Sequence, residues 1–199
     1  MAGTASYDHL VVGGGIVGAA VAYGLAKAGG SVALIDEGDV AFRAARGNFG
    51  NVWVQGKGGS SPAYADLSRT AADDWAGFAE ELEERTGIDL HFRRPGAFYI
   101  CFSQEELDRR AAALAGIESR ASIPAPFEVL GRDELARRVP EIGPDIAGAT
   151  YSAADGTANP LFLLRALIAA TCALGGTYLP RRAVSAISPD GDGFEVTAA

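Results

Sequence analysis

The sequence predicts an α/β fold that begins with a strand, a helix and a second strand. Three observations predict it. Residues 7–12 form a short apolar run of strand length, a glycine-rich turn and a helical pattern follow without a gap, and residues 31–35 form a second apolar run. Strands that alternate with helices favour a parallel sheet with helices on its faces, so we expect a doubly wound arrangement.

The turn after the first strand carries the pattern Gly-x-Gly-x-x-Gly at Gly13, Gly15 and Gly18. The first glycine allows a tight turn, the second lets a pyrophosphate approach the backbone, and the third lets the helix pack close to the strand. Asp36 follows at the tip of the second strand, at the distance expected of an acid that binds ribose hydroxyls. Because strand, helix and acid accompany the glycines, the pattern predicts a dinucleotide site rather than a structural turn.

The helix that starts at this turn is expected to extend to about residue 28, and its N-terminal N–H groups and positive dipole end would point at the diphosphate. Its apolar stripe is expected at Val17, Ala20, Val21 and Leu25. The longer flavoprotein form of the pattern is also matched, at Ala22, Leu25, Ala26, Gly29 and Val32. Asp36, however, stands where flavoproteins usually carry glutamate, so this acid alone leaves FAD and NAD both open.

Composition and charge exclude several classes of protein. The 199 residues are 48% hydrophobic, enough for one sizeable core, and the net charge of −8 argues against nucleic acid or an anionic membrane surface as partner. Cys101 and Cys172 are far apart and indicate reduced core thiols, while His9 and His91 lack ligand-type neighbours, so no metal site is expected. Since neither a signal peptide nor a transmembrane segment is recognised, the expected compartment is the cytoplasm.

Residues 42–58 form an unusual segment that is neither a clean helix nor a clean strand. Four glycines, two arginines and three side-chain amides make it rich in hydrogen-bond donors, which suits contact with a planar, electron-rich ring and a phosphate. The alternative is an ordinary surface loop, which would expose Trp53.

Residues 7–58 resemble the start of the FAD-dependent family that includes D-amino-acid oxidase, glycine oxidase and sarcosine oxidase, the DAO type. The run Arg-Gly-Asn-Phe-Gly-Asn-Val-Trp-Val-Gln-Gly-Lys-Gly at 46–58 is most similar to the flavin subunits of the opine oxidase and hydrogen cyanide synthase group. The resemblance implies FAD as cofactor, a Rossmann-like FAD-binding βαβ unit and part of an α+β substrate domain. It also implies that residues 42–58 pass along the ribityl chain and the isoalloxazine ring.

The glycine pattern, the acid and the resemblance together predict a set of cofactor-binding residues. They are Gly13, Gly14, Gly15, Ile16, Val17, Gly18, Asp36, Glu37, Arg43, Ala44, Ala45, Asn48, Phe49, Gly50, Asn51 and Val184. By resemblance, Val184 meets the adenine through its backbone. Many relatives carry Ser or Thr where this chain has Ala44 and Ala45, so backbone N–H groups would replace any hydroxyl contact there.

Beyond residue 58, turn residues and periodicity predict alternating helices and strands. Helices are expected over 62–86, 103–118, 133–138 and 161–173, and strands over 89–93, 97–102, 127–130, 147–151, 177–179, 183–188 and 194–197. Ser103 with Glu106 forms a capping box, and Asn159-Pro160 is a cap followed by an N1 proline.

Two of these expectations concern packing. The strands at 89–93 and 97–102 are joined through Arg94-Pro95-Gly96, which predicts a hairpin. The helix at 161–173 is apolar nearly all round, which predicts burial on all sides.

The resemblance covers essentially all of this chain but only about half of a typical family member, so the chain is expected to be an N-terminal half, apparently truncated. The expected domains are an FAD-binding βαβ unit with the flavin loop at 1–58, a partial substrate-side α+β region at 59–150, and a return segment to the FAD domain at 151–199.

The resemblance implies an FAD-dependent oxidoreductase that oxidises the C–N bond of a small amino acid, imino acid or opine by hydride transfer to flavin. No catalytic residue is nominated, because the substrate-binding arginine and tyrosine of the family generally lie in its second half. Further subunits of a hetero-oligomer are implied as partners. Two alternatives stay open: a non-catalytic FAD-binding fragment or subunit that needs a partner chain, and an NAD-dependent dehydrogenase.

Overall fold

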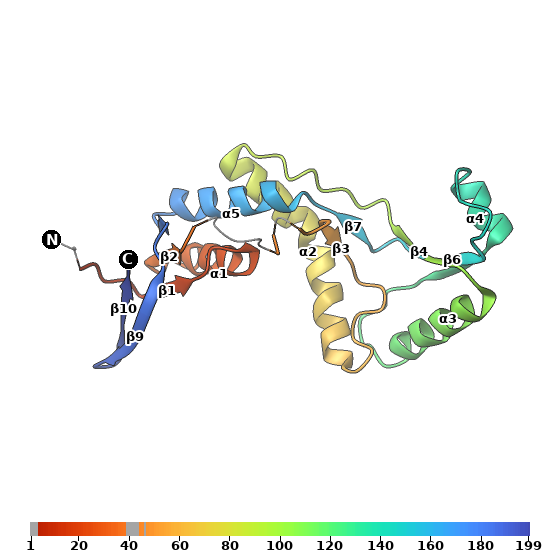
Figure 1. Cartoon of the computed structure of the whole chain (residues 1–199), viewed down its shortest axis with the longest axis horizontal. Helices are drawn as coiled ribbons and strands as arrows, with labels where there is room; N and C mark the ends of the chain where they lie inside the picture. The colour runs from red at the N-terminus through yellow and green to blue at the C-terminus, as the bar shows by residue number, and fades with distance from the viewer. Residues whose placement is uncertain (1–3, 39–43, 46) are drawn as a thin grey trace. The chain divides into compact units, whose positions relative to one another are not determined.

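The computed structural model describes residues 4–38, 44–45 and 47–199, and its chain divides into two compact units (Figure 1). Unit 1 consists of Met1–Phe49, Ala79–Leu90 and Asn159–Ala199, and unit 2 consists of Gly50–Phe78 and His91–Ala158. Each unit therefore combines segments that are far apart in the sequence. The domain division at 1–58, 59–150 and 151–199 stays a prediction.

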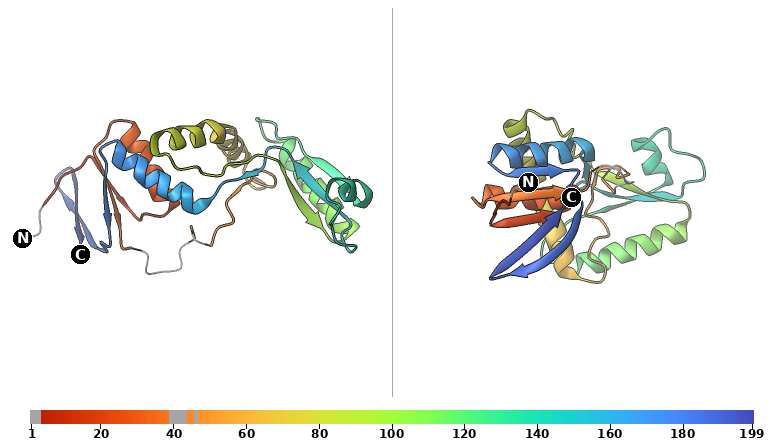
Figure 2. Two further views of the ribbon diagram at one scale, coloured as in Figure 1. Left: turned by 90° about the horizontal axis from the view of Figure 1, so that it is seen from above. Right: turned by 60° about the vertical axis from the view of Figure 1, so that its left-hand side comes forward.

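Unit 1 contains a three-stranded parallel sheet in the order β1-β2-β8. The strands are β1 (His9–Val12), β2 (Val32–Asp36) and β8 (Thr177–Pro180). Every residue of the central strand β2 is buried, which is typical of a parallel strand with a neighbour on each side and helices on the sheet. Two of those helices, α1 (Ile16–Lys27) and α5 (Pro160–Ala173), pack against each other (Figure 2).

Helix α1 buries a different stripe from the one its sequence predicts. Val17 and Val21 are 79% and 48% exposed, and Ala20 is also exposed. The buried residues are Ala19, Ala22, Tyr23 and Ala26. Because nearly every position of this helix is apolar, its periodicity does not distinguish the two stripes, and the small alanines allow the closer approach to β2 and α5.

Helix α5 begins as predicted, because the Asn159 side chain accepts hydrogen bonds from the N–H groups of Leu161 and Phe162 at 3.0 and 3.2 Å, and proline follows at N1. The prediction that it is buried all round is wrong. Leu161 is 46% exposed. The buried residues lie on one stripe and are Leu163, Ala166, Leu167, Ala170 and Thr171.

The last part of unit 1 is a two-stranded antiparallel hairpin of β9 (Val184–Asp190) and β10 (Gly193–Ala198). Gly193 pairs with Asp190 at its turn, so the two strands predicted there are confirmed. Helix α2 (Pro62–Thr86) contributes to both units, up to Phe78 in unit 2 and from Ala79 in unit 1.

Unit 2 contains a three-stranded antiparallel sheet in the order β4-β6-β5. The strands are β4 (Ala97–Cys101), β5 (Glu128–Gly131) and β6 (Gly148–Ser152); two short strands, β3 (Asn51–Val52) and β7 (Gly156–Thr157), pair separately. Helices α3 (Gln104–Glu118) and α4 (Arg132–Arg138) accompany the sheet. The Ser103 cap of α3 is confirmed, since Glu106 N–H donates to Ser103 Oγ at 3.2 Å, but the Glu106 carboxylate accepts its reciprocal bond from Phe102 N–H at 2.8 Å, one residue before the predicted partner.

The predicted hairpin between residues 89–93 and 97–102 is wrong. Strand β4 pairs with β6 instead, and of the earlier segment only Arg93 makes an isolated bridge, to Thr157. Left-handed backbone at His91, with φ of 52°, interrupts the extended chain there. The turn at residues 94–96 bonds to a distant segment instead of closing a hairpin, since Gly96 N–H donates to the Asp155 carbonyl at 3.1 Å.

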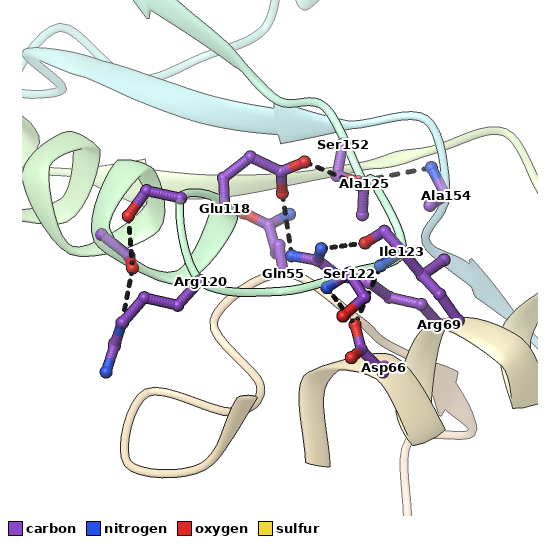
Figure 3. Close-up of polar contacts among 12 residues, drawn as sticks. Gln55, Asp66, Arg69, Glu118, Arg120, Ser122, Ile123, Ala125, Ser152 and Ala154 are labelled. Atoms are coloured by element: carbon purple, nitrogen blue, oxygen red, sulfur yellow. Dashed lines mark hydrogen bonds and ion pairs between the residues drawn. The ribbon is translucent and has the colours of Figure 1, made fainter. Parts of the chain in front are cut away.

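The proline-containing loop at 119–127 is held by charged side chains of α2 and α3 (Figure 3). Asp66 accepts hydrogen bonds from the N–H groups of Ser122 and Ile123 at 2.8 and 2.9 Å. Glu118 pairs with the buried Arg69 at 2.8 Å, and Arg69 also donates to the Ile123 carbonyl. These bonds satisfy backbone groups that the loop cannot pair within itself.

Candidate cofactor-binding site

The glycine turn lies at the carboxyl end of β1, between two neighbouring parallel strands. Gly13 has a φ of 103°, a conformation that favours glycine, and its N–H donates to the carbonyl of Ile35 in β2 at 2.8 Å. Helix α1 starts three residues later at Ile16. This edge of a parallel sheet is where doubly wound folds bind their ligands.

The glycines of the turn are needed for different reasons. A Cβ on Gly18 would lie 1.9 Å from the Gly13 carbonyl oxygen, and a Cβ on Gly14 would lie 2.9 Å from Cβ of Asp36. Both positions are therefore closed to larger residues by the protein itself. A Cβ on Gly15 would meet no atom of the described residues within 4 Å, so protein packing does not demand glycine there.

Asp36 ties the glycine turn to the chain that follows β2. Its side chain is buried, Oδ2 accepts a hydrogen bond from Gly14 N–H at 2.6 Å, and Oδ1 accepts one from Gly38 N–H at 2.9 Å. A carboxylate oxygen can accept more than one hydrogen bond, so these contacts are compatible with a further donor such as a ribose hydroxyl. The acid thus has a structural task that sequence reasoning missed.

The N-terminus of α1 suits an anion. Its N-cap is Gly15, which provides no side-chain cap, and its first turn contains no acidic residue. The positive dipole end is therefore not neutralised within the helix itself. Lys27 complements the opposite end of α1, and its Nζ pairs with Glu81 at 2.7 Å.

The segment that leads into β9 contacts the same region of unit 1. Arg182 N–H donates to the Asp36 carbonyl at 2.8 Å, and a Cβ on Gly38 would lie 3.1 Å from Cγ of Arg181. Val184, which is partly buried, begins β9 two residues beyond this contact. Sequence reasoning missed Arg182, since a backbone contact leaves no side-chain signal; the Asp-Glu-Gly turn at 36–38 could have indicated Gly38.

The remaining predicted residues of unit 1 differ in exposure. Glu37, Ala44 and Asn48 are exposed, Ala45 is buried, and Phe49 is 91% exposed. Arg43 lies outside the described residues.

The last two predicted loop residues, Gly50 and Asn51, belong to unit 2. Gly50 is buried, has a φ of 79°, and its carbonyl accepts a hydrogen bond from Ala158 N–H at 2.8 Å. Asn51 is exposed and pairs with Thr157 in the β3–β7 ladder. In unit 1 the structure therefore brings Gly13–Gly18 and Asp36 together with residues 181–182, which lead to Val184. Gly50 and Asn51 lie within unit 2.

The described part of the chain contains no group of three or more His, Cys, Asp or Glu side chains arranged to hold a metal ion. None of its helices is long and apolar enough to cross a membrane.

Comparison with known proteins defines the class of this protein. The family model for FAD dependent oxidoreductase, DAO, matches residues 8–199. The chain belongs to this family, and the resemblance noted in its sequence is confirmed. Because FAD is the cofactor of the family, the choice between FAD and NAD that Asp36 alone left open is decided.

Among particular proteins, the chain is 43% identical over 188 residues to a subunit of the opine oxidase of Agrobacterium tumefaciens (strain Ach5), covering 94% of this chain and 51% of that protein. It is 26% identical over 186 residues to glycine oxidase of Bacillus subtilis (strain 168), covering 94% and 48%. The solved structure of glycine oxidase from Geobacillus kaustophilus superposes with a TM-score of 0.87 at 30% identity, over 98% of this chain and 52% of that one. The chain thus spans about half the length of the relatives it matches.

Proposed function

We propose that these residues form part of an FAD-dependent oxidase or dehydrogenase that oxidises the C–N bond of a small amino acid, an imino acid or an opine. When bound, FAD would supply the two-electron acceptor for the hydride removed from that carbon. The family supports the cofactor, and the names opine oxidase and glycine oxidase support the substrate class. No residue of this chain is nominated as catalytic.

The observation that carries the proposal is the glycine turn beside an uncapped helix N-terminus. A Cβ at Gly15 would meet open space while Gly14 and Gly18 are packed, which suits a diphosphate lying against the backbone at Gly15. We assign the diphosphate to Gly13–Gly18, the ribose to Asp36 and Glu37, and the adenine to Val184.

The flavin loop is proposed to lie along the ribityl chain and the ring. Its members are Arg43, Ala44, Ala45, Asn48, Phe49, Gly50 and Asn51. Phe49, at 91% exposed, has a large apolar surface that contact with a planar ring would cover. A partner chain is also proposed, because the opine oxidase relative is named as a subunit.

The proposal is tested with Gly15→Val in the full-length protein. The added side chain meets no described protein atom near its Cβ but would fill the space assigned to pyrophosphate oxygens, so we expect FAD affinity to fall below detection while the fold is retained. Flavin fluorescence titration measures the affinity, and circular dichroism checks the fold. Residues 1–199 alone are expected to bind FAD weakly and to oxidise no amine, because they span about half the length of the relatives and a cofactor site usually buries most of its ligand.

The matched control is Gly24→Val, on the exposed side of the same helix, where a Cβ also meets nothing within 4 Å. It should leave FAD affinity unchanged. Stoichiometric FAD in Gly15→Val would refute the assignment of the loop. Reduction of the bound flavin by alcohols or thiols but by no amine would refute the C–N substrate class. Bound flavin that no substrate reduces would favour the non-catalytic alternative.

A further inference from the structure

Asp155 is a fully buried acid in unit 2 whose carboxylate partners all lie in one short segment. Its Oδ1 accepts hydrogen bonds from the N–H groups of Val54 and Gln55 at 2.6 and 3.3 Å, and its Oδ2 accepts one from Gln55 Nε2 at 2.7 Å. Within the described part of the chain, no cationic side chain forms an ion pair with it. The carboxylate is therefore held by N–H donors of residues 54 and 55.

Burial of the Asp155 carboxylate costs free energy that an apolar core would not cost. Burying an ionised carboxylate carries a large desolvation penalty, which hydrogen bonds from amides offset only when they are short and well aligned. A pair of apolar side chains would fill the same space without that penalty. In this buried site the Asp155 carboxylate and the Val54 and Gln55 N–H groups therefore depend on each other for their hydrogen bonds.

Gln55 extends the same network to the neighbouring sheet. Its side chain is 7% exposed, its Nε2 also donates to the Ala97 carbonyl at 3.1 Å, and its Oε1 accepts from Thr150 Oγ1 at 2.9 Å. Its carbonyl accepts from Trp53 Nε1 at 2.7 Å. Both ends of the amide are thus bonded, which fixes its orientation.

The chain just before Gln55 is held along the segment that contains Asp155. Asn51 pairs with Thr157 in the β3–β7 ladder, and the Gly50 carbonyl accepts from Ala158 N–H at 2.8 Å. The two pairs of the β3–β7 ladder, the Gly50 carbonyl bond and one buried acid therefore anchor the stretch from Gly50 to Gln55 against 155–158. Gly50 and Asn51 are the two residues of the proposed flavin loop in this unit.

We propose that Asp155, acting through Gln55 and the Val54 amide, is a positioning residue that sets the backbone of the flavin loop at Gly50 and Asn51. The part of this inference that concerns the cofactor rests on the proposed function. The part that concerns the backbone does not, so the two are tested separately.

The first test is hydrogen exchange of the apo protein carrying Asp155→Asn. Asparagine preserves the shape but is neutral, so its oxygen accepts weaker hydrogen bonds from the Val54 and Gln55 N–H groups, and its Nδ2 faces Gln55 Nε2, where the bond to Oδ2 is lost. We expect the Val54 and Gln55 amides to exchange at least about tenfold faster and the amides of β3 (Asn51–Val52) to be accelerated by a smaller factor, with strand β4 unchanged. The matched control is Asp145→Asn, an exposed acid of the same unit, which should change neither.

A milder variant guards against unfolding. Thr150→Val replaces the hydroxyl that donates to Gln55 Oε1 with a methyl group of similar size, while Arg110 still donates to that oxygen at 3.4 Å, so the same two amides should be accelerated by a smaller factor. Three results in Asp155→Asn would overturn the proposal: unchanged exchange at Val54 and Gln55, acceleration there that does not extend to β3, or acceleration spread evenly over unit 2.

The second test uses the FAD-loaded full-length protein. If the loop positions the cofactor, Asp155→Asn and Thr150→Val should weaken FAD binding and shift the visible flavin spectrum, in the order of their exchange effects, whereas Asp145→Asn should not. Faster exchange with unaltered affinity and spectrum would overturn the role toward the cofactor. A wild-type protein that binds no FAD would refute the proposed function, while the exchange result would still decide the role of Asp155 in the backbone.

Discussion

The glycines of the turn differ in the neighbouring atoms that prevent a larger side chain at each position. Gly18 is constrained by the Gly13 carbonyl, and Gly14 by the Asp36 side chain, whereas Gly15 has no such neighbour. Identical residues therefore serve two purposes here: packing at Gly14 and Gly18, and in our proposal access for a ligand at Gly15. Stability and binding measurements separate the two purposes.

Gly18→Ala is expected to destabilise the protein by about 1–3 kcal/mol, because helix α1 must shift to relieve a contact of 1.9 Å with a backbone oxygen. Gly15→Ala should cost less, about 0.5–1 kcal/mol, because alanine is a poorer N-cap than glycine. Urea denaturation of both variants beside the wild type measures the difference. Equal losses in the two variants would contradict the packing argument.

Among the elements, helix α2 uses a carboxylate near each of its ends to bind another segment of the chain. Near its start, Asp66 holds the loop at 119–127, and hydrogen bonds from the Ile123 and Ser122 N–H groups keep the pKa of Asp66 below its ordinary value. Near its end, Glu81 receives hydrogen bonds from Lys27 and Tyr23 of α1, and these keep its pKa low.

The Asp66 contact predicts a pH dependence. A carboxyl whose pKa is lowered on folding contributes stability above its unfolded pKa, and that contribution is lost as the pH falls through its folded pKa, here below about pH 4. Asp66→Asn should therefore be less stable than the wild type at pH 7, with a difference that shrinks at pH 3 and below. Denaturation at both pH values measures it.

The control for that prediction is Asp74→Asn, an exposed acid on the same helix. It should show no comparable loss at neutral pH. A difference between Asp66→Asn and the wild type that is constant from pH 7 to pH 2 would mean that the ionised carboxylate is not what holds the loop.

At the scale of the whole molecule, unit 1 exposes apolar side chains and an unpaired strand edge to solvent. Within the described residues, strand β1 pairs only with β2 and so presents an open edge. The large apolar side chains exposed on β1 and α1 are Leu10, Val12, Val17 and Val21. Open edges and contiguous apolar surfaces favour association with other chains.

Residues 1–199 are therefore expected to associate in solution through this surface. Light scattering at increasing protein concentration should give a mass above 20.5 kDa for the wild type and a lower mass for Val21→Lys, whose charge would be placed on the exposed face of α1. Leu67→Lys, at a 66% exposed position of unit 2, is the control and should associate like the wild type. A wild-type chain that stays monomeric at every concentration would contradict the prediction.

Local signals in the chain were enough to predict the strand, glycine turn and helix at the N-terminus, the acid at the tip of β2, the caps of α3 and α5, and the final pair of strands. Each depends on residues within a few positions of one another, where backbone preferences and capping hydrogen bonds act directly. The family followed from the same local patterns.

The packing partners had to come from the tertiary structure. Which stripe of α1 is buried, and the pairing of β4 with β6 in place of a hairpin, depend on segments distant in sequence. The contacts of Asp36 with Gly14 and of Asp155 with Val54, 101 residues away, are likewise non-local. A sequence pattern records that a residue is apolar or acidic, but the fold decides which group lies within hydrogen-bonding distance of it, because that distance is set by the packing of the whole unit.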